Sequence, residues 1–279
     1  MSSTDDQPSS QYGQGRLTYN DYLKVPELLS LQQLLSKPPH HDEMLFIVIH
    51  QAYELWFRLM LHELEKSMRL MRAQQILQAR HFIHRVVTIM RLLVQQIHIL
   101  ETMTAADFLQ FRHRLEPASG FQSLQFREIE FVVGLKDERY IENLAHRESE
   151  AAALRRRYEE PSLRETYYEM LRALSFDIPS DTSTTALEQD DQTRAQLLNA
   201  LKQIYQDPIK QASLYVLSES LVDLDQQLSL WRYHHVLVVE RIIGNKPGTG
   251  GSSGASYLRT TMAKRAFPYL WQVRTWLDS

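Results

Sequence analysis

The stretch from Leu221 to Gly254 constrains the fold more than any other part of the chain. Residues spaced there by alternating threes and fours are large and apolar with one exception, His235; they are Leu221, Leu224, Leu228, Trp231, His235, Val238 and Ile242. A helix with this spacing buries one face, so we predict that His235 points into a core. The helix is expected to end at Gly244, before the glycine-rich loop GTGGSSG at 248–254.

Helical periodicity continues through most of the chain. The predicted helices cover 42–72, 79–103, 105–115, 209–243 and 257–276, with shorter charge-rich helices within 137–175. Because no strand-like alternation appears, we predict an all-α bundle of long helices. Helices of roughly 30 residues, against a mean of about 12, favour a core that continues across a subunit interface in an oligomer. The apolar residues of 44–61 occupy almost every face, which predicts a helix buried on several sides.

Two segments of the chain are expected to lack a fixed structure. A polar tail at 1–16 is predicted to be disordered. It precedes a single helical domain at 17–279, within which the polar segment 176–194 is predicted to be a mobile excursion.

The composition excludes several kinds of site and partner. Because the chain has no cysteine, disulfides, iron–sulfur clusters, thiolate-bound haem and cysteine nucleophiles are excluded. A net charge of −3 gives no reason to expect nucleic acid or an acidic membrane as a partner. The N-terminus lacks the pattern of a signal peptide, and polar side chains interrupt the apolar stretch 44–61. We therefore expect no membrane span and a soluble, cytoplasmic protein.

Two histidines lie on the apolar faces of long predicted helices. His50 shares its face with Phe57 and Leu61, as His235 does with its own neighbours. For either residue alone, a hydrogen-bonded core histidine is the more common role, but bundles also build cofactor sites between facing helices. The chain contains neither Glu-x-x-His nor His-Glu-x-x-His. A haem needs one axial imidazole and an apolar slot, which His235 fits better than any multi-ligand metal site.

Arg112 and Thr249 are candidate substrate-binding residues. Arg112 follows Phe108 by one turn on an apolar helix face, where its guanidinium either snorkels to water or recognises a carboxylate in two-point fashion. Thr249 lies in the 248–254 loop, which lacks both the Gly-Lys-Ser/Thr and the Gly-x-Gly-x-x-Gly nucleotide motifs. The loop is either a mobile lid with hydroxyl donors or a flexible helix connector.

Together these segments carry a family resemblance. LTYNDYL (17–23), FIVIHQAYELWF (46–57), DFLQFRHRLEPASGFQSLQFRE (107–128) and WRYHHVLVVERIIGNKPGTGGSSG (231–254) resemble the signature blocks of the tryptophan 2,3-dioxygenase family, in family order. The resemblance runs from about Leu17 to the C-terminus. It implies an enzyme that inserts both atoms of O2 across the indole 2,3-double bond of L-tryptophan to give N-formyl-L-kynurenine, the first step of tryptophan catabolism. The alternative is a haem-binding or haem-sensing bundle without turnover.

The resemblance also implies one haem b per subunit, ferrous in the active state. His235 corresponds to the proximal iron ligand, and the adjacent His234 falls on a variable position. His50 corresponds to the residue that hydrogen-bonds the indole N–H. Because an indole N–H is a very weak acid, we expect His50 to orient the ring and not to act as a base.

The remaining site residues follow by position. Arg112 is expected to bind the substrate carboxylate, and Thr249 the ammonium group. Phe46 and Phe108 line the indole pocket, although members with tyrosine at the position of Phe108 have a hydroxyl that this chain lacks. The other implied contacts are Ser119 and Gly120, near the haem edge, and Tyr19 and Tyr22, which reach a neighbouring subunit's site in a homotetramer.

Overall fold

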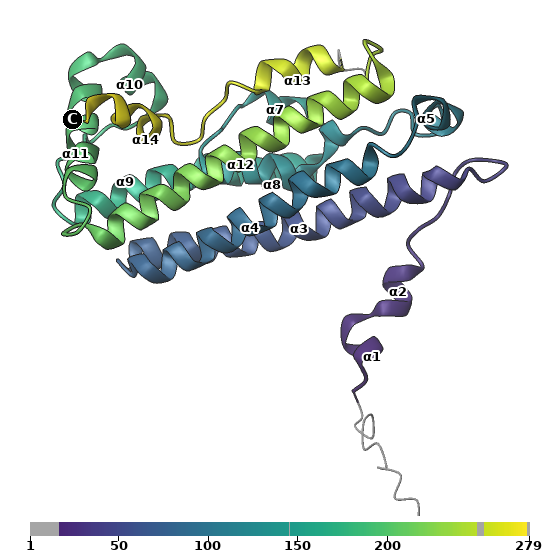
Figure 1. The fold of residues 1–279 in the computed structure, drawn as a ribbon, viewed down its shortest axis with the longest axis horizontal. Coiled ribbons are helices and arrows are strands. Elements are labelled where there is room, and N and C mark those ends of the chain that lie inside the picture. Colours follow the sequence, from purple (N-terminus) through teal and green to yellow (C-terminus); the bar gives the residue numbers. More distant parts are fainter. Residues whose placement is uncertain (1–16, 145, 250–253, 278–279) are drawn as a thin grey trace, which may run out of the picture.

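Three long helices lie side by side and form the body of the protein (Figure 1). They are α3 (His41–Arg72), α4 (Ile76–Leu100) and α12 (Ala212–Ile243), and α4 packs against both of the others. The structure, a computed structural model, describes residues 17–144, 146–249 and 254–277. No strand occurs in that part of the chain. The all-α prediction is therefore confirmed. The tail predicted at 1–16 lies outside the described residues.

The other helices are shorter. They are α1 (Tyr19–Leu23), α2 (Val25–Leu29), α5 (Ala105–Arg112), α6 (Leu124–Val133), α7 (Arg139–Asn143), α8 (Glu148–Glu159), α9 (Leu163–Ala173), α10 (Thr184–Gln189), α11 (Asp191–Gln206), α13 (Ala255–Thr261) and α14 (Pro268–Gln272), with the 3-10 turns η1 (Gly120–Gln122) and η2 (Val273–Trp276). α6 and α9 pack on α3, and α13 packs on α12.

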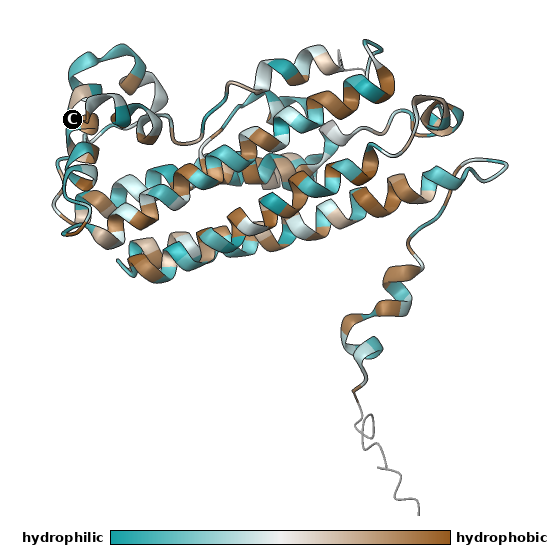
Figure 2. Cartoon of the chain, viewed as in Figure 1, coloured by the Kyte–Doolittle hydropathy of each residue, from teal (hydrophilic) through white to brown (hydrophobic). Residues whose placement is uncertain are grey.

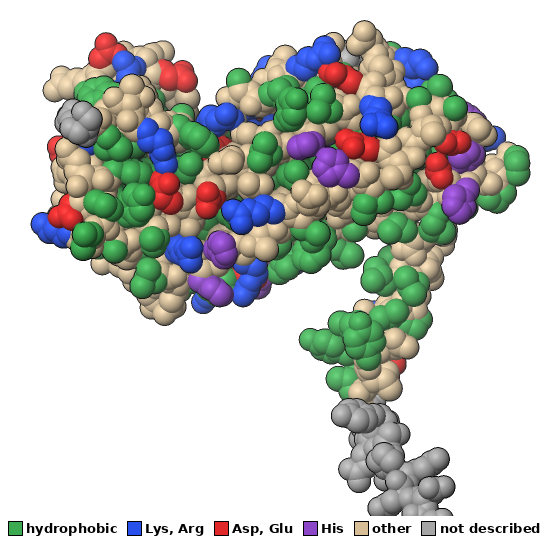
Figure 3. All heavy atoms as spheres, in the orientation of Figure 1, with side chains coloured by type: hydrophobic (Ala, Val, Ile, Leu, Met, Phe, Trp, Pro, Cys, Tyr) green, Lys and Arg blue, Asp and Glu red, His purple; other side chains and the backbone are tan. Residues whose placement is uncertain are grey.

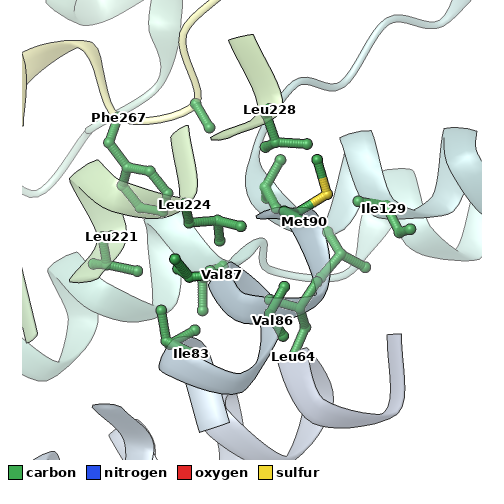
Figure 4. Close-up of a cluster of buried hydrophobic side chains, with 14 of the residues drawn as sticks. Leu64, Ile83, Val86, Val87, Met90, Ile129, Leu221, Leu224, Leu228 and Phe267 are labelled. Carbon is green, nitrogen blue, oxygen red and sulfur yellow. The ribbon is translucent and has the colours of Figure 1, made fainter. Parts of the chain in front are cut away.

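The core lies where these helices meet. Figure 4 shows apolar side chains from α3, α4, α6 and α12 in contact, with Phe267 closing the cluster. Leu64, Val87 and Leu221 are each 0% exposed. The apolar members of the stripe predicted on α12 are buried as well, from Leu221 to Ile242, which is 7% exposed, whereas His235 is only partly buried. Burial of each large apolar side chain contributes about 1.5–3 kcal/mol, so this stripe fixes the rotation of α12 and with it the direction of His235.

The two ends of α3 have charges that suit a helix. His40 caps the first turn by accepting the Asp42 N–H, at 3.3 Å. Acidic Asp42 lies at the N-terminal end and basic Arg69 and Arg72 lie at the C-terminal end, where each sign opposes the helix dipole. The helix predicted at 42–72 is thus confirmed.

The single helix predicted at 257–276 is wrong. The chain instead forms α13, a non-helical link at 262–267, and then α14 and η2. Pro268 disfavours helical backbone in the residue before it. The buried carboxylate of Asp225 on α12 accepts the N–H groups of Ala266, at 2.8 Å, and Phe267, at 3.1 Å. These bonds satisfy main-chain groups that a continuous helix would have paired internally.

The segment 176–194 has regular structure of its own. It contains α10, capped by Ser183, and Leu187 is buried at 1% exposure. The predicted excursion is therefore attached to the core through at least one side chain. Its mobility stays a prediction.

One face of α3 is not covered within the chain, contrary to the prediction that this helix is buried on several sides. Met44, Val48 and Leu55 are 41%, 45% and 57% exposed. The arm formed by α1 and α2 projects away from the bundle and carries further apolar side chains (Figure 2). Figure 3 shows hydrophobic side chains on the arm and on the neighbouring side of the bundle. By length and composition alone α3 is also apolar enough to cross a membrane.

Candidate active site

A cavity with two connected chambers lies between α3, α4 and α12. Both chambers have a mostly apolar lining with a few polar side chains, as is typical of small-molecule and cofactor sites. Residues of α3, α4, α12, α13 and the 3-10 turn line both; the shared ones are His50, Leu100, Gly120, His235, Val238 and Leu258. The two histidines singled out from the sequence therefore line one space.

His235 enters the cavity from α12. Trp231, one turn earlier, stacks on its ring with centroids 5.0 Å apart and planes 28° apart. Burial lowers the pKa of His235 to about 4, and electrostatic interactions with His50 and Arg127 act in the same direction. The imidazole is therefore neutral at physiological pH, so that a ring nitrogen has a lone pair available for a metal.

His50 lies on α3, and a main-chain carbonyl sets which of its ring nitrogens carries the hydrogen. Its Nδ1 is 2.7 Å from the carbonyl oxygen of Phe46. A carbonyl only accepts, so Nδ1 carries the hydrogen. Burial lowers the pKa of His50, although the Phe46 carbonyl and the charge of Glu54 partly oppose this. In the resulting neutral ring, Nε2 is a hydrogen-bond acceptor.

Aromatic side chains form part of the second chamber. The rings of Phe46 and His50 have centroids 4.1 Å apart, and those of Phe46 and Phe108 are 5.6 Å apart. Phe46 and Phe108 both line this chamber. The structure thus brings together the residues predicted for an indole pocket, with geometry suited to an aromatic ligand.

Arg112 and Thr249 line the same chamber. Arg112 is the last residue of α5, and its Nη2 donates to the carbonyl oxygen of Pro247. The Thr249 hydroxyl donates to the carbonyl oxygen of Ala118, at 2.6 Å. Residues 250–253 of the predicted loop lie outside the described residues.

The other predicted contacts divide into two groups. Ser119 and Gly120 line the second chamber, and Gly120 also lines the first. Tyr19 and Tyr22 are 74% and 72% exposed on the arm, and neither lines the cavity of its own chain. The site of one chain therefore assembles without these tyrosines.

A buried group of charges in the wall of the first chamber was missed by the sequence reasoning. Glu130 accepts hydrogen bonds from Arg127, at 2.5 Å, and from Arg232, at 2.9 Å, and all three are less than a tenth exposed. Arg127 and Glu130 are three residues apart on α6, which was a usable indication of an ion pair within the helix. Arg232 is 102 positions from Glu130, so local spacing gave no sign of its part.

Glu54 is a second missed carboxylate in the cavity wall. It accepts the Ser123 hydroxyl at 2.6 Å and the Gln125 amide at 2.8 Å. Ser123 in turn caps α6 by accepting the Phe126 N–H, at 3.2 Å. These bonds hold the N-terminus of α6 against α3, one turn from His50.

The family of the chain follows from comparison with known proteins. A family model described as tryptophan 2,3-dioxygenase matches residues 3–179 and 184–277. The chain belongs to the tryptophan 2,3-dioxygenase family. A tryptophan 2,3-dioxygenase from Nocardioides sp. is 45% identical over 265 residues, which are 93% of this chain and 94% of the relative. The enzyme of the same name from Herpetosiphon aurantiacus is 46% identical over 259 residues, covering 92% and 97%, and that from Myxococcus xanthus is 40% identical over 261 residues, covering 94% and 90%.

Proposed function

We propose that this chain is a haem-dependent enzyme that inserts O2 across the indole 2,3-double bond of L-tryptophan, giving N-formyl-L-kynurenine. Membership of the tryptophan 2,3-dioxygenase family over nearly the whole chain supports the reaction. The observation that carries the assignment to this site is the convergence of His50, Arg112 and His235 on one cavity.

The residues of the cavity fit one haem b per subunit, with His235 as proximal ligand. In the described part of the chain no group of three or more His, Asp or Glu side chains is placed to hold a metal, whereas haem iron requires only one imidazole from the protein. Arg127 and Arg232 also lie in the wall of the first chamber, where their guanidinium groups would suit the carboxylates of a haem.

Ferrous haem held by His235 would supply the iron at which O2 is activated. The apolar lining of the chambers would keep water from the reacting atoms. The protein's contribution is then mainly to hold tryptophan in the reactive geometry.

Three side chains would orient the substrate. His50 Nε2 would accept the indole N–H, in agreement with a role in orientation, because Nδ1 already donates to Phe46. Arg112 would pair with the carboxylate through its guanidinium. Thr249 would contact the ammonium group, while Phe46 and Phe108 would flank the indole ring.

The assembly we propose is a cytoplasmic homotetramer in which Tyr19 and Tyr22 contact the site of a neighbouring subunit. The exposed apolar arm and the uncovered face of α3 support burial in an oligomer. The buried Glu43 and Glu63 of α3 support a soluble bundle helix over a membrane span, since carboxylates are costly inside a bilayer.

One experiment tests both the haem and the reaction. Haem-reconstituted, reduced protein is mixed with O2 and L-tryptophan, and the absorbance of N-formylkynurenine is followed. His235→Ala should lose tightly held haem and turnover. His234→Ala, which removes the adjacent imidazole, should keep both. Haem binding without product would favour the haem-binding or haem-sensing alternative, and a normal haem spectrum in His235→Ala would exclude His235 as the axial ligand.

A further inference from the structure

Two hydrogen bonds join the segment after α12 to the segment around the end of α5. Arg112 donates to the carbonyl of Pro247, and Thr249 donates to the carbonyl of Ala118. The partners are 135 and 131 positions apart in the chain. Each segment thus provides one side-chain donor and one carbonyl acceptor. The two bonds hold residues 247–249 against the second chamber, which Gly248 and Thr249 line.

The same segment is held at its base. Gly254 has a φ of +63°, and a Cβ there would be 2.6 Å from the Lys246 carbonyl oxygen. The backbones of residues 246 and 254 are therefore so close that only glycine fits at position 254. Pro247 has a fixed φ, which limits the directions that its carbonyl can take. The acceptor facing Arg112 is consequently part of a well-defined piece of backbone.

We propose that the main-chain carbonyl of Pro247 is a positioning group for carboxylate recognition. Bound to one N–H of Arg112, it fixes the plane of the guanidinium and leaves the other N–H groups for a carboxylate. An arginine that is already oriented loses less conformational freedom when the ligand binds. The inference rests on the proposed role of Arg112, and it makes Pro247 a determinant of selectivity for indoles that carry a carboxylate.

Equilibrium binding to the holoenzyme tests this directly. Isothermal titration with L-tryptophan and with tryptamine, which keeps the ammonium group and lacks only the carboxylate, is compared for the wild type, Pro247→Gly and the neighbouring control Lys246→Ala. Because glycine frees the backbone that holds the carbonyl, Pro247→Gly should weaken L-tryptophan by about three- to fivefold. Binding of tryptamine should be the same in both variants as in the wild type. Equal weakening of both ligands, or of neither, would overturn the proposal.

A double-mutant cycle shows whether Pro247 acts through Arg112. In an Arg112→Ala background, Pro247→Gly should cause no further loss of L-tryptophan affinity. The same fold-loss as in the wild-type background would overturn the positioning role while leaving Arg112 as the carboxylate ligand. If Arg112→Ala alone weakened both ligands equally, the proposed role of Arg112 would fail, and the inference about Pro247 with it.

Discussion

At the scale of single residues, the cavity keeps His235 uncharged. Its folded pKa of about 4 lies below the ordinary value of 6.5. Between these two values the unfolded chain binds a proton that the folded chain does not. The free energy of unfolding should therefore fall as the pH drops from 6.5 to about 4. Above pH 6.5, His235 is neutral in both states and should not change the stability with pH.

Chemical denaturation of the haem-free protein at pH 7 and pH 5 measures this effect. The decrease in unfolding free energy should be smaller in His235→Gln than in the wild type, by roughly 2 kcal/mol. Carboxylates titrate in both proteins and cancel in the comparison. An identical decrease in the two proteins would show that the cavity does not depress the pKa of His235.

Arg112 should distinguish ligands by their carboxylate. Loss of a hydrogen bond to a charged group costs about 1.5–3 kcal/mol, so Arg112→Ala should weaken L-tryptophan by roughly 10- to 100-fold. Binding of tryptamine, measured on the same holoenzyme, should change little. Comparable losses for both ligands would mean that the substitution disturbs the chamber as a whole.

At the scale of elements, the base of the 246–254 loop depends on a close main-chain approach. Gly254→Ala would place its Cβ 2.6 Å from the Lys246 carbonyl oxygen, and backbone strain of this kind costs about 1–3 kcal/mol. We expect L-tryptophan binding to weaken by roughly 5- to 100-fold, with haem content unchanged.

Gly244→Ala is the matched control for this prediction. Gly244 has nearly the same backbone angles as Gly254, with φ 60° and ψ −133°, but a Cβ there meets nothing within 4 Å. The control isolates the contact from the strain of a positive φ. Equal effects of the two substitutions on L-tryptophan binding would remove the contact as the cause.

Helix positions could be predicted well because their causes are local. The ends of α3 and α12 follow from capping residues, dipole-compatible charges and Gly244, all of which are close in the chain. The break before Pro268 was missed, although Pro268 itself was visible. What stabilises the break is Asp225, which is 41 positions from Ala266, and no local pattern reports such a contact.

At the scale of the whole molecule, the uncovered face of α3 should be a subunit contact. Leu55 is 57% exposed in the chain, and its burial in an oligomer would contribute about 1.5–3 kcal/mol. Leu55→Lys should therefore lower the mass measured by light scattering after gel filtration, because the lysine charge would have to be desolvated.

Ile209→Lys is the control for Leu55→Lys, because it also replaces an exposed apolar side chain with lysine. Ile209 is 90% exposed between α11 and α12, away from α3 in the chain, and Ile209→Lys should leave the mass unchanged. If Leu55→Lys also left the mass unchanged, this face of α3 would not be the contact.

The sequence alone determined the helical architecture, the buried stripe that carries His235, and the candidates His50, Arg112 and Thr249. Periodicity could do so because a helix repeats its faces at a fixed interval. Only the tertiary structure decided which helix faces meet, and it placed His50 and His235 in one cavity. It also joined Arg232 to the ion pair of Arg127 and Glu130. The hydrogen bond from Arg112 to the Pro247 carbonyl likewise appeared only in the structure. The physical reason is that hydrogen-bond geometry between segments more than 100 positions apart is fixed by packing, which no local spacing contains.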